Sequence, residues 1–409
     1  MKLSYVIISH NRRQRLLETL PRLIRRTPLP ADQWETIVVD NASADGTAEA
    51  VAQQFPKVKL FRNSKNEGMY ARNRGIAQSQ GQYVITLDDD SYPADSRTIP
   101  TALAYMDAKP AVGAVTGRVV LPDGRQEAPA LPGVFIGCAV CFRKSILERV
   151  GGFRREFFRQ AEEYDLSFRI WGAGSRVERR EEILFKHAKT ADTINRSAAM
   201  VQAMDLRNNL IIAQRFLPGD LRRIYWEDWE LRYAALARHS GLRAAARKAM
   251  RSAWWWRLRD RVLGGRLPLP PAAIDSIFRF REQSAKIGAW ARRENVWRVV
   301  LAGFSKNMWA TFNGCLSSGL QLRCVADENP AFEGLEYRGL PIVPNRRAFE
   351  GGGIDGVVVT NVNAAQVEAQ AAAVRRTFRG PILKLVEPSK PVAKPAATAK
   401  APAPRAQAA

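Results

Sequence analysis

The sequence predicts an α/β protein with a mostly parallel sheet in its first domain, a helical basic middle segment and a second, smaller α/β domain. Strand-like and helix-like segments alternate over the first 110 residues and again between 296 and 386. Residues 216–298 contain seven of the ten Trp, and Lys and Arg outnumber Asp and Glu in this segment. The expected domains are 1–215, 216–295 and 296–388, followed by a disordered Ala/Pro/Lys-rich tail at 389–409.

The first domain is expected to begin with a strand and to continue as strand–helix pairs. Strands are expected at Leu3–Ser9, Thr36–Val39, Val58–Phe61, Tyr83–Leu87, Val115–Val120, Val134–Phe142 and Ile183–Phe185. Helices are expected at Arg13–Arg26, Ala44–Phe55, Gly68–Ser79, from Lys144 and over Glu162–Arg169, with Ser43 capping the second of them. Ligands bind at the carboxyl ends of parallel strands, and both Asp40 and Asp88–Asp90 stand at such ends.

Three consecutive carboxylates, Asp88, Asp89 and Asp90, end the strand Tyr83–Leu87. Unpaired ionised groups are costly next to an apolar strand, so this cluster calls for a cation. Hard oxygen ligands suit Mn²⁺ or Mg²⁺, which commonly accompany phosphate groups. The alternative is an acidic turn that binds nothing.

The net charge of +23 over 409 residues predicts anionic partners. Nucleic acid is not expected among them, because no nucleic-acid-binding module is recognisable. There is neither a signal peptide nor an apolar run of about 18 residues, and the four cysteines suggest no disulfide framework. We therefore expect a cytoplasmic protein, with peripheral attachment to the inner membrane face as an option.

Six motifs follow one another in the first half of the chain. They are Val6–Arg12, Val38–Thr47, Asn66–Gly68 with Ala71–Gly75, Leu87–Asp90, Gly151–Phe153 with Glu162–Leu166, and His187. In this order and spacing they make residues 1–215 resemble the GT-A inverting glycosyltransferases of family 2. The resemblance implies a nucleoside-diphosphate sugar donor, UDP- or dTDP-linked, and an ion of Mn²⁺ or Mg²⁺.

The resemblance also implies roles for individual residues. Asp88 and Asp90 would bind the metal ion with His187 completing its shell, and Asp88 and Asp89 would also face the nucleotide sugar. The remaining donor contacts would come from Ser9, Asn11, Asp40, Asn66 and Arg72. Three alternatives remain open: Asp40 capping a turn, Arg72 on a solvated helix face, and His187 in a structural role.

An inverting transfer needs a base that deprotonates the acceptor hydroxyl. The family position of this base falls on Glu163, where Asp is commoner, and Asp165 remains a second candidate. Positions 162 and 165 share a helical face from which 163 is offset, so they are not expected to act equivalently. The alternative for Glu162–Arg169 as a whole is a capped, salt-bridged helix without a catalytic role. Arg154 and Arg155 stand where the family usually has acidic residues, which suggests an anionic or lipid-diphosphate acceptor.

The basic helix expected over Leu242–Leu263 contains Trp254–Trp256. Such a helix could dock on an anionic membrane, or its tryptophans could pack between domains while arginines solvate the outside. The unit at 296–386 resembles, more loosely, small Rossmann-like domains of sugar-modifying enzymes. Asp327 stands where a ribose-binding acid would be, but Gly303–Met308 lacks the usual glycines, so we expect a structural or interaction domain, with dinucleotide binding as the alternative.

The expected function is metal-dependent transfer of a sugar to a hydroxyl of a glycan or lipid-linked acceptor in cell-envelope polysaccharide assembly. Two alternatives stay open. One is transfer to polyprenyl phosphate, which attacks without needing a base, and the other is a catalytically silent GT-A scaffold at the membrane.

Overall fold

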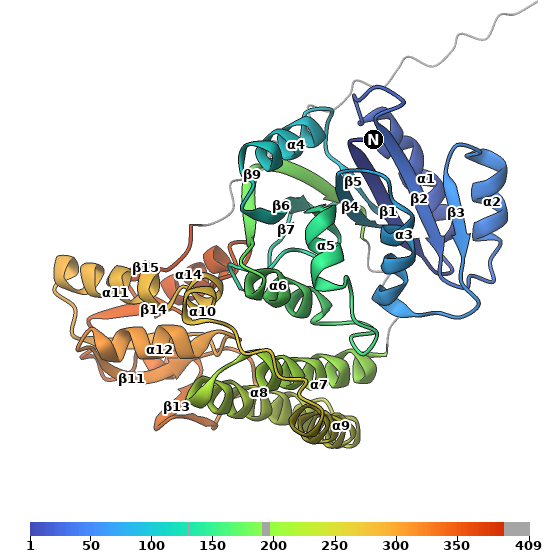
Figure 1. The fold of residues 1–409 in the computed structure, drawn as a ribbon. Helices are drawn as coiled ribbons and strands as arrows, with labels where there is room; N and C mark the ends of the chain where they lie inside the picture. Colours follow the sequence, from blue (N-terminus) through green and yellow to red (C-terminus); the bar gives the residue numbers. More distant parts are fainter. Residues whose placement is uncertain (130, 190–196, 388–409) are drawn as a thin grey trace, which may run out of the picture.

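The computed structural model describes residues 1–129, 131–189 and 197–387. Its first sheet domain stands above the helices of residues 198–262, and the second sheet domain lies beside these helices, at the lower left of the view (Figure 1). No helix in these three ranges is long and apolar enough to cross a membrane. The predicted tail at 389–409 lies outside the described residues.

The first sheet has the strand order β3-β2-β1-β4-β8-β6-β9-β5, with β7 paired to β6. Strands β3, β2, β1 and β4 run parallel, while β8 runs antiparallel between β4 and β6. The bounds are β1 (Leu3–Ser9), β2 (Trp34–Asp40), β3 (Lys59–Arg62), β4 (Tyr83–Asp88), β5 (Ser91–Pro93), β6 (Val112–Val120), β7 (Gln126–Glu127), β8 (Ala139–Arg143) and β9 (Arg176–His187). The predicted mostly parallel α/β sheet is confirmed.

Helices cover both faces of this sheet because its strands are apolar on both sides. They are α1 (Arg13–Arg25), α2 (Thr47–Gln54), the 3₁₀ turn η1 (Gly68–Ala71), α3 (Arg72–Gln78), α4 (Thr98–Ala108), α5 (Lys144–Val150) and α6 (Glu162–Gly172). Two local predictions were wrong. Helix α2 begins at Thr47 and is not capped by Ser43, whose Oγ instead accepts the Asn11 N–H. The strand expected from Val134 begins only at Ala139, although Val134 is buried.

The helical layer consists of α7 (Ala198–Phe216), α8 (Gly219–His239), α9 (Arg243–Val262), α10 (Pro271–Phe278) and α11 (Phe280–Glu294), so it begins before the expected boundary at 216. Its apolar core includes Trp226 and Trp229 from α8. A fully buried ion pair also holds it together, because Arg215 Nε lies 2.6 Å from Asp260 Oδ2. Removing one partner of such a pair typically costs about 3–5 kcal/mol, since it leaves a buried charge uncompensated.

The second sheet has the order β12-β13-β11-β10-β14-β15. Its strands are β10 (Arg298–Ala302), β11 (Gln321–Ala326), β12 (Glu336–Tyr337), β13 (Leu340–Val343), β14 (Gly356–Val359) and β15 (Ile382–Lys384). Helices α12 (Met308–Ser317), α13 (Asn345–Ala348) and α14 (Val367–Arg375) accompany them. Apart from the antiparallel pair of β12 and β13, this is a parallel sheet, which confirms the predicted second α/β unit.

Candidate active site

The carboxyl ends of the central strands bring the predicted acids to one edge of the first sheet. Ser9 at the end of β1 pairs in register with Asp40 of β2, and Ile8 pairs with Asp88 of β4. Ser9 Oγ donates a hydrogen bond of 2.9 Å to Asp89 Oδ2. The chain thus places Ser9, Asp40 and the triple Asp side by side.

Asp88, Asp90 and His187 form a cluster whose ligand atoms lie within 4.8 Å of one another. Antiparallel pairing of β5 with β9 creates it, since Ser91 pairs with His187 and so brings His187 beside Asp90. His187 Nε2 lies 3.0 Å from Asp90 Oδ1, yet this buried oxygen has no well-aligned hydrogen bond within the described residues. Two carboxylates and one imidazole with an unsatisfied buried oxygen fit a divalent cation.

Glu127 orients the imidazole of His187. Its Oε2 lies 2.7 Å from His187 Nδ1, so the Nδ1–H donates to Glu127 and Nε2 faces Asp90. A carboxylate that holds the far nitrogen of a histidine is typical of metal sites. Burial alone would lower the pKa of His187, but Cys138, Asp90 and Glu127 together raise it well above its ordinary value.

Arg12 supplies positive charge to the same carboxylates. Its Nη2 lies 2.5 Å from Asp90 Oδ2, and its Nε lies 3.2 Å from Asp89 Oδ1. Burial raises the pKa of Asp89 to about 7, with Asp90 and Asp88 adding to the rise, although Arg12 opposes it. Burial would raise the pKa of Asp90 too, but His187 and Arg12 outweigh it and bring that pKa to about 2.

Arg72 lies beneath the triple Asp and not on a solvated helix face. Its side chain is fully buried, and its Nη2 lies 2.6 Å from Asp88 Oδ1. The guanidinium also stacks over Phe153, 5.4 Å from the ring centroid. Its Nε and Nη1 are buried and make no hydrogen bond within the described residues. In this geometry Arg72 positions Asp88 from below.

Three other predicted donor residues contact the loops around the edge. Asp40 Oδ2 accepts the Ser43 N–H at 3.2 Å, as the turn-capping alternative expects, while the buried Oδ1 has no partner within the described residues. Asn11 Oδ1 accepts the Ala44 N–H at 2.7 Å, and Asn66 Oδ1 accepts the Asn41 side-chain amide at 3.0 Å. Asn11 and Asn66 therefore fix loop conformation, whereas Asp40 keeps a free oxygen.

Glu163 opens helix α6 together with Glu162. Burial raises the pKa of Glu163 well above its ordinary value, and the neighbouring Glu162 and Asp205 raise it further. Burial also raises the pKa of Glu162, whose surroundings include Arg72 and Asp88. The start of α6 thus stands beside the acidic cluster. A carboxyl with a raised pKa at this place is suited to exchanging a proton near neutral pH.

Asp165 is held by two arginines, Arg154 and Arg169, and is 1% exposed at its side chain. Arg169 Nε donates to Asp165 Oδ2 at 2.9 Å, and Arg154 Nη1 lies 3.6 Å from Oδ1. Arg169 also donates to the carbonyls of Val150 and Gly152. These contacts fix the Gly-Gly-Phe turn against α6 and occupy Asp165 with arginine partners, whereas no cation forms an ion pair with Glu163 among the described residues.

The second domain reaches this region through Lys306. Its Nζ lies 2.9 Å from Asp205 Oδ2 on α7, and its charge lowers the pKa of Glu163 against the larger rise from burial. At the turn where a dinucleotide would bind, both the glycine and the acid make contacts within the domain. A Cβ at Gly303 would stand 1.6 Å from Gln370 Nε2, and Asp327 Oδ2 accepts the Phe304 N–H at 2.6 Å.

Three residues near the acids were missed as site residues: Glu127, Arg12 and Lys306. Arg12 lies in a quoted motif but was not singled out. Glu127 sits on the two-residue strand β7, in a loop with no regular pattern. Lys306 belongs to another domain, so no local signal in the sequence links it to Glu163.

The model of the family described as Glycosyl transferase family 2 matches residues 4–172. EpsE of Bacillus subtilis, a provisionally assigned glycosyltransferase, is 26% identical over 217 residues, which are 48% of this chain and 76% of EpsE. The poly(ribitol-phosphate) β-N-acetylglucosaminyltransferase TarS of Staphylococcus aureus is 29% identical over 111 residues, 26% of this chain but only 19% of TarS.

Among solved structures, S. aureus TarS 1–349 in complex with UDP-GlcNAc is similar to this chain at 15% identity. The TM-score is 0.48, and the match covers 83% of this chain and 98% of that one. The mannosyltransferase PcManGT from Pyrobaculum calidifontis, in complex with GDP-Man and Mn²⁺, is 20% identical. It has a TM-score of 0.43, with coverage of 62% and 74%.

Proposed function

We propose that this chain, whose residues 4–172 match the model of glycosyl transferase family 2, is a glycosyltransferase of that family with the GT-A fold that the sequence motifs implied. We infer that it moves a sugar from a nucleoside diphosphate to a hydroxyl group, with inversion and with a bound Mn²⁺ or Mg²⁺. The observation that supports this best is the cluster of Asp88, Asp90 and His187 at the carboxyl edge of the sheet.

The residues that would hold the metal ion are Asp88, Asp90 and His187, with Glu127 fixing the imidazole. When bound, the ion supplies positive charge that neutralises the departing diphosphate. A histidine among the ligands favours Mn²⁺ over Mg²⁺, since Mg²⁺ prefers oxygen. Arg12, which lies on Asp89 and Asp90, is available to contact the diphosphate through its forked donors.

The loops at the strand ends would bind the nucleotide-sugar donor. The unpaired Oδ1 of Asp40 is suited to accept a hydrogen bond from the base or ribose, and Ser9 holds Asp89 in place. Arg72 keeps Asp88 oriented from below. We assign shaping roles to Asn11 and Asn66, through the loop contacts that they make.

Glu163 is the candidate base. The acceptor hydroxyl would pass its proton to the Glu163 carboxylate while its oxygen attacks the anomeric carbon and the diphosphate leaves. Asp165 is the weaker candidate, because both of its oxygens face arginines that must be satisfied. The names of relatives such as TarS and the teichuronic acid glycosyltransferase TuaG support an acceptor in cell-envelope polysaccharide assembly.

A donor panel tests the proposal. The purified chain is incubated with UDP-, dTDP- and GDP-sugars in the presence of Mn²⁺, Mg²⁺ or EDTA, and nucleotide release is followed. We expect saturable binding of one class of donor and metal-dependent hydrolysis or transfer, abolished by EDTA. Failure to bind any donor under all metal conditions would overturn the proposal and favour a silent scaffold.

The proposed role of His187 predicts that metal affinity rises with pH. Cys138, Asp90 and Glu127 raise the pKa of His187 and so favour its protonated form, from which Nε2 must lose a proton to become a ligand. The affinity should therefore keep rising above about pH 6.5, where an ordinary histidine is already half titrated. Mn²⁺ titrations by calorimetry between about pH 6 and 9, in buffers of different ionisation enthalpy, should show proton release on binding.

Affinity and proton release that do not change with pH would remove His187 from the ligand set. His187→Gln provides the matched variant, since it keeps a polar side chain but has no imidazole proton to lose. Its residual Mn²⁺ affinity should be lower and flatter with pH. His10 does not lie in the cluster, so His10→Gln is the control that should leave the pH dependence unchanged.

A further inference from the structure

Helix α9 presents an apolar stripe to solvent. Trp254, Trp255, Leu258 and Val262 are between 51% and 71% exposed, and Leu263 continues the stripe beyond the helix at 68%. Residues 254, 258 and 262 are four apart, so they align along one side of α9. The other side packs inward through Ala249 and Ala253. Core packing therefore explains one face of α9 and not the stripe.

Cations surround this stripe without exposed acids on the same helix. Helix α9 contains seven Lys or Arg and a single acidic residue, Asp260, which is buried against Arg215. Arg247, Lys248, Arg251 and Arg261 are all exposed. The outward face of α9 therefore combines large apolar side chains with uncompensated positive charge, at the outer edge of the helical layer (Figure 1).

We propose that the outward face of α9 docks the protein on an anionic lipid bilayer, with the helix lying in the plane of the interface. The two indoles and the aliphatic side chains enter the boundary between headgroups and acyl chains, where tryptophan is favoured. The flanking Arg and Lys side chains contact lipid phosphates. No helix has to cross the bilayer for this attachment.

The composition of the stripe favours lipid over the other anionic partners. A nucleic acid would pair with the cations and stack on the indoles, but it offers nothing to Leu258, Val262 and Leu263. The core of a protein interface is depleted in charge, whereas here exposed Arg and Lys side chains share the outward face of α9 with the apolar side chains. A bilayer surface satisfies both kinds of side chain at once.

The sequence left open whether the tryptophans of this segment dock on a membrane or pack between domains, and the structure places some of them inside the protein and some on its surface. Trp226 and Trp229 are buried in the helical core. Trp256 is partly buried and packs under cations, with Arg215 5.0 Å and Arg259 4.7 Å from its ring centroid. Only Trp254 and Trp255 of this group remain largely exposed, and they define the proposed docking face.

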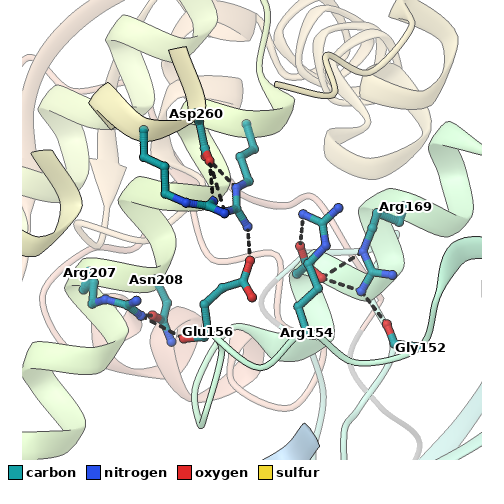
Figure 2. A network of polar contacts seen from close by, with 10 residues as sticks. Gly152, Arg154, Glu156, Arg169, Arg207, Asn208 and Asp260 are labelled. Atoms are coloured by element: carbon teal, nitrogen blue, oxygen red, sulfur yellow. Dashed lines mark hydrogen bonds and ion pairs between the residues drawn. The ribbon is translucent and has the colours of Figure 1, made fainter. Parts of the chain in front are cut away.

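Ion pairs and hydrogen bonds connect helix α9, which carries the docking face, to the segment next to the candidate active site. Arg215 bridges Asp260 of α9 and Glu156, with Nη1 2.8 Å from Glu156 Oε1 (Figure 2). Arg207 of α7 also donates to the Glu156 carbonyl at 2.9 Å. Because Glu156 belongs to the segment that leads into α6, a docked α9 would hold α6 in a fixed orientation to the membrane. The docking itself is independent of the proposed chemistry.

Vesicle flotation of the full chain tests this inference without donor or metal. Vesicles of phosphatidylcholine alone are compared with vesicles containing about 30 mol% phosphatidylglycerol. We expect flotation with the anionic vesicles, weakened by salt, and little with the neutral ones. Trp254→Ser with Trp255→Ser should reduce the bound fraction by about tenfold, and Arg251→Glu with Arg261→Glu should do the same.

Trp297→Ser is the matched control, because Trp297 is 63% exposed but lies outside α9. It should float like the parent chain, and circular dichroism should show that all variants are folded. The inference is overturned if the parent does not float with either vesicle, or if the α9 variants float as well as the control. Retention on duplex DNA with no flotation would assign the face to nucleic acid instead.

Discussion

Glu163→Gln is expected to lower sugar transfer to a hydroxyl acceptor by about 10²- to 10⁴-fold while donor affinity changes little. Glutamine keeps the size and hydrogen-bonding capacity of the side chain but cannot take up the acceptor proton. The loss should therefore appear in the rate of transfer, not in donor binding. Initial rates with saturating donor, together with donor titration by calorimetry, measure the two quantities separately.

The pH profile of the parent enzyme gives the same prediction a second readout. A base acts in its deprotonated form, so the rate should rise with pH through the pKa of Glu163 and level off above it. Because burial raises that pKa, the rise should lie above the range near 4.3 where an ordinary glutamate titrates. At Mn²⁺ concentrations that saturate the enzyme across the whole pH range, the rising limb should disappear in Glu163→Gln.

Glu148→Gln is the control for this pair of measurements, since Glu148 is exposed on α5 and should not alter the rate. A Glu163→Gln variant with near-parental transfer to a hydroxyl would remove Glu163 from the mechanism. A third outcome would favour polyprenyl phosphate as the acceptor. In that case the parent enzyme does not transfer sugar to hydroxyls, and both the parent and Glu163→Gln transfer it to polyprenyl phosphate, because a phosphate anion needs no base.

The first sheet could be predicted from sequence because its evidence is local. Each parallel strand, such as Leu3–Ser9 or Tyr83–Asp88, is a short apolar run that ends in a polar residue. Parallel pairing then places those ends at one edge, and the observed register of Ser9 with Asp40 confirms that step. The start of α2 was misplaced because the Asp45 carboxylate accepts the Thr47 N–H, so the turn at 41–46 is extended by three residues.

The finer geometry of the site depends on contacts between distant segments. His187 meets Asp90 only because β5 pairs with β9, and Glu127 reaches His187 from a strand of two residues. The short strands β5 and β7, which bring these residues together, have no hydrophobic pattern long enough to be recognised in the sequence. Lys306 comes near Glu163 through domain packing, which no spacing in the sequence encodes. The choice between Glu163 and Asp165 also needed the positions of Arg154 and Arg169.

Asp90→Asn is expected to reduce metal-dependent transfer by at least about 10³-fold. An ion that stabilises the leaving diphosphate contributes several kcal/mol, and about 4 kcal/mol corresponds to a factor of about 10³ in rate. Asparagine has nearly the same volume but a neutral, weaker oxygen ligand. It also leaves Arg12 and His187 facing one carboxylate fewer, so Mn²⁺ affinity and rate should fall together.

Asp123→Asn separates this effect from a general change of charge, because Asp123 is half-exposed in a turn and pairs only with nearby Arg125 within the described residues. Thermal melting checks that Asp90→Asn remains folded, which matters because Arg12 loses an ion-pair partner. Since Asp88 and His187 would remain, a weak, EDTA-sensitive activity at high Mn²⁺ is consistent with the proposed ligand set. Unchanged Mn²⁺ affinity and rate would instead place the ion elsewhere, and Arg12 would then be the principal positive charge on the triple Asp.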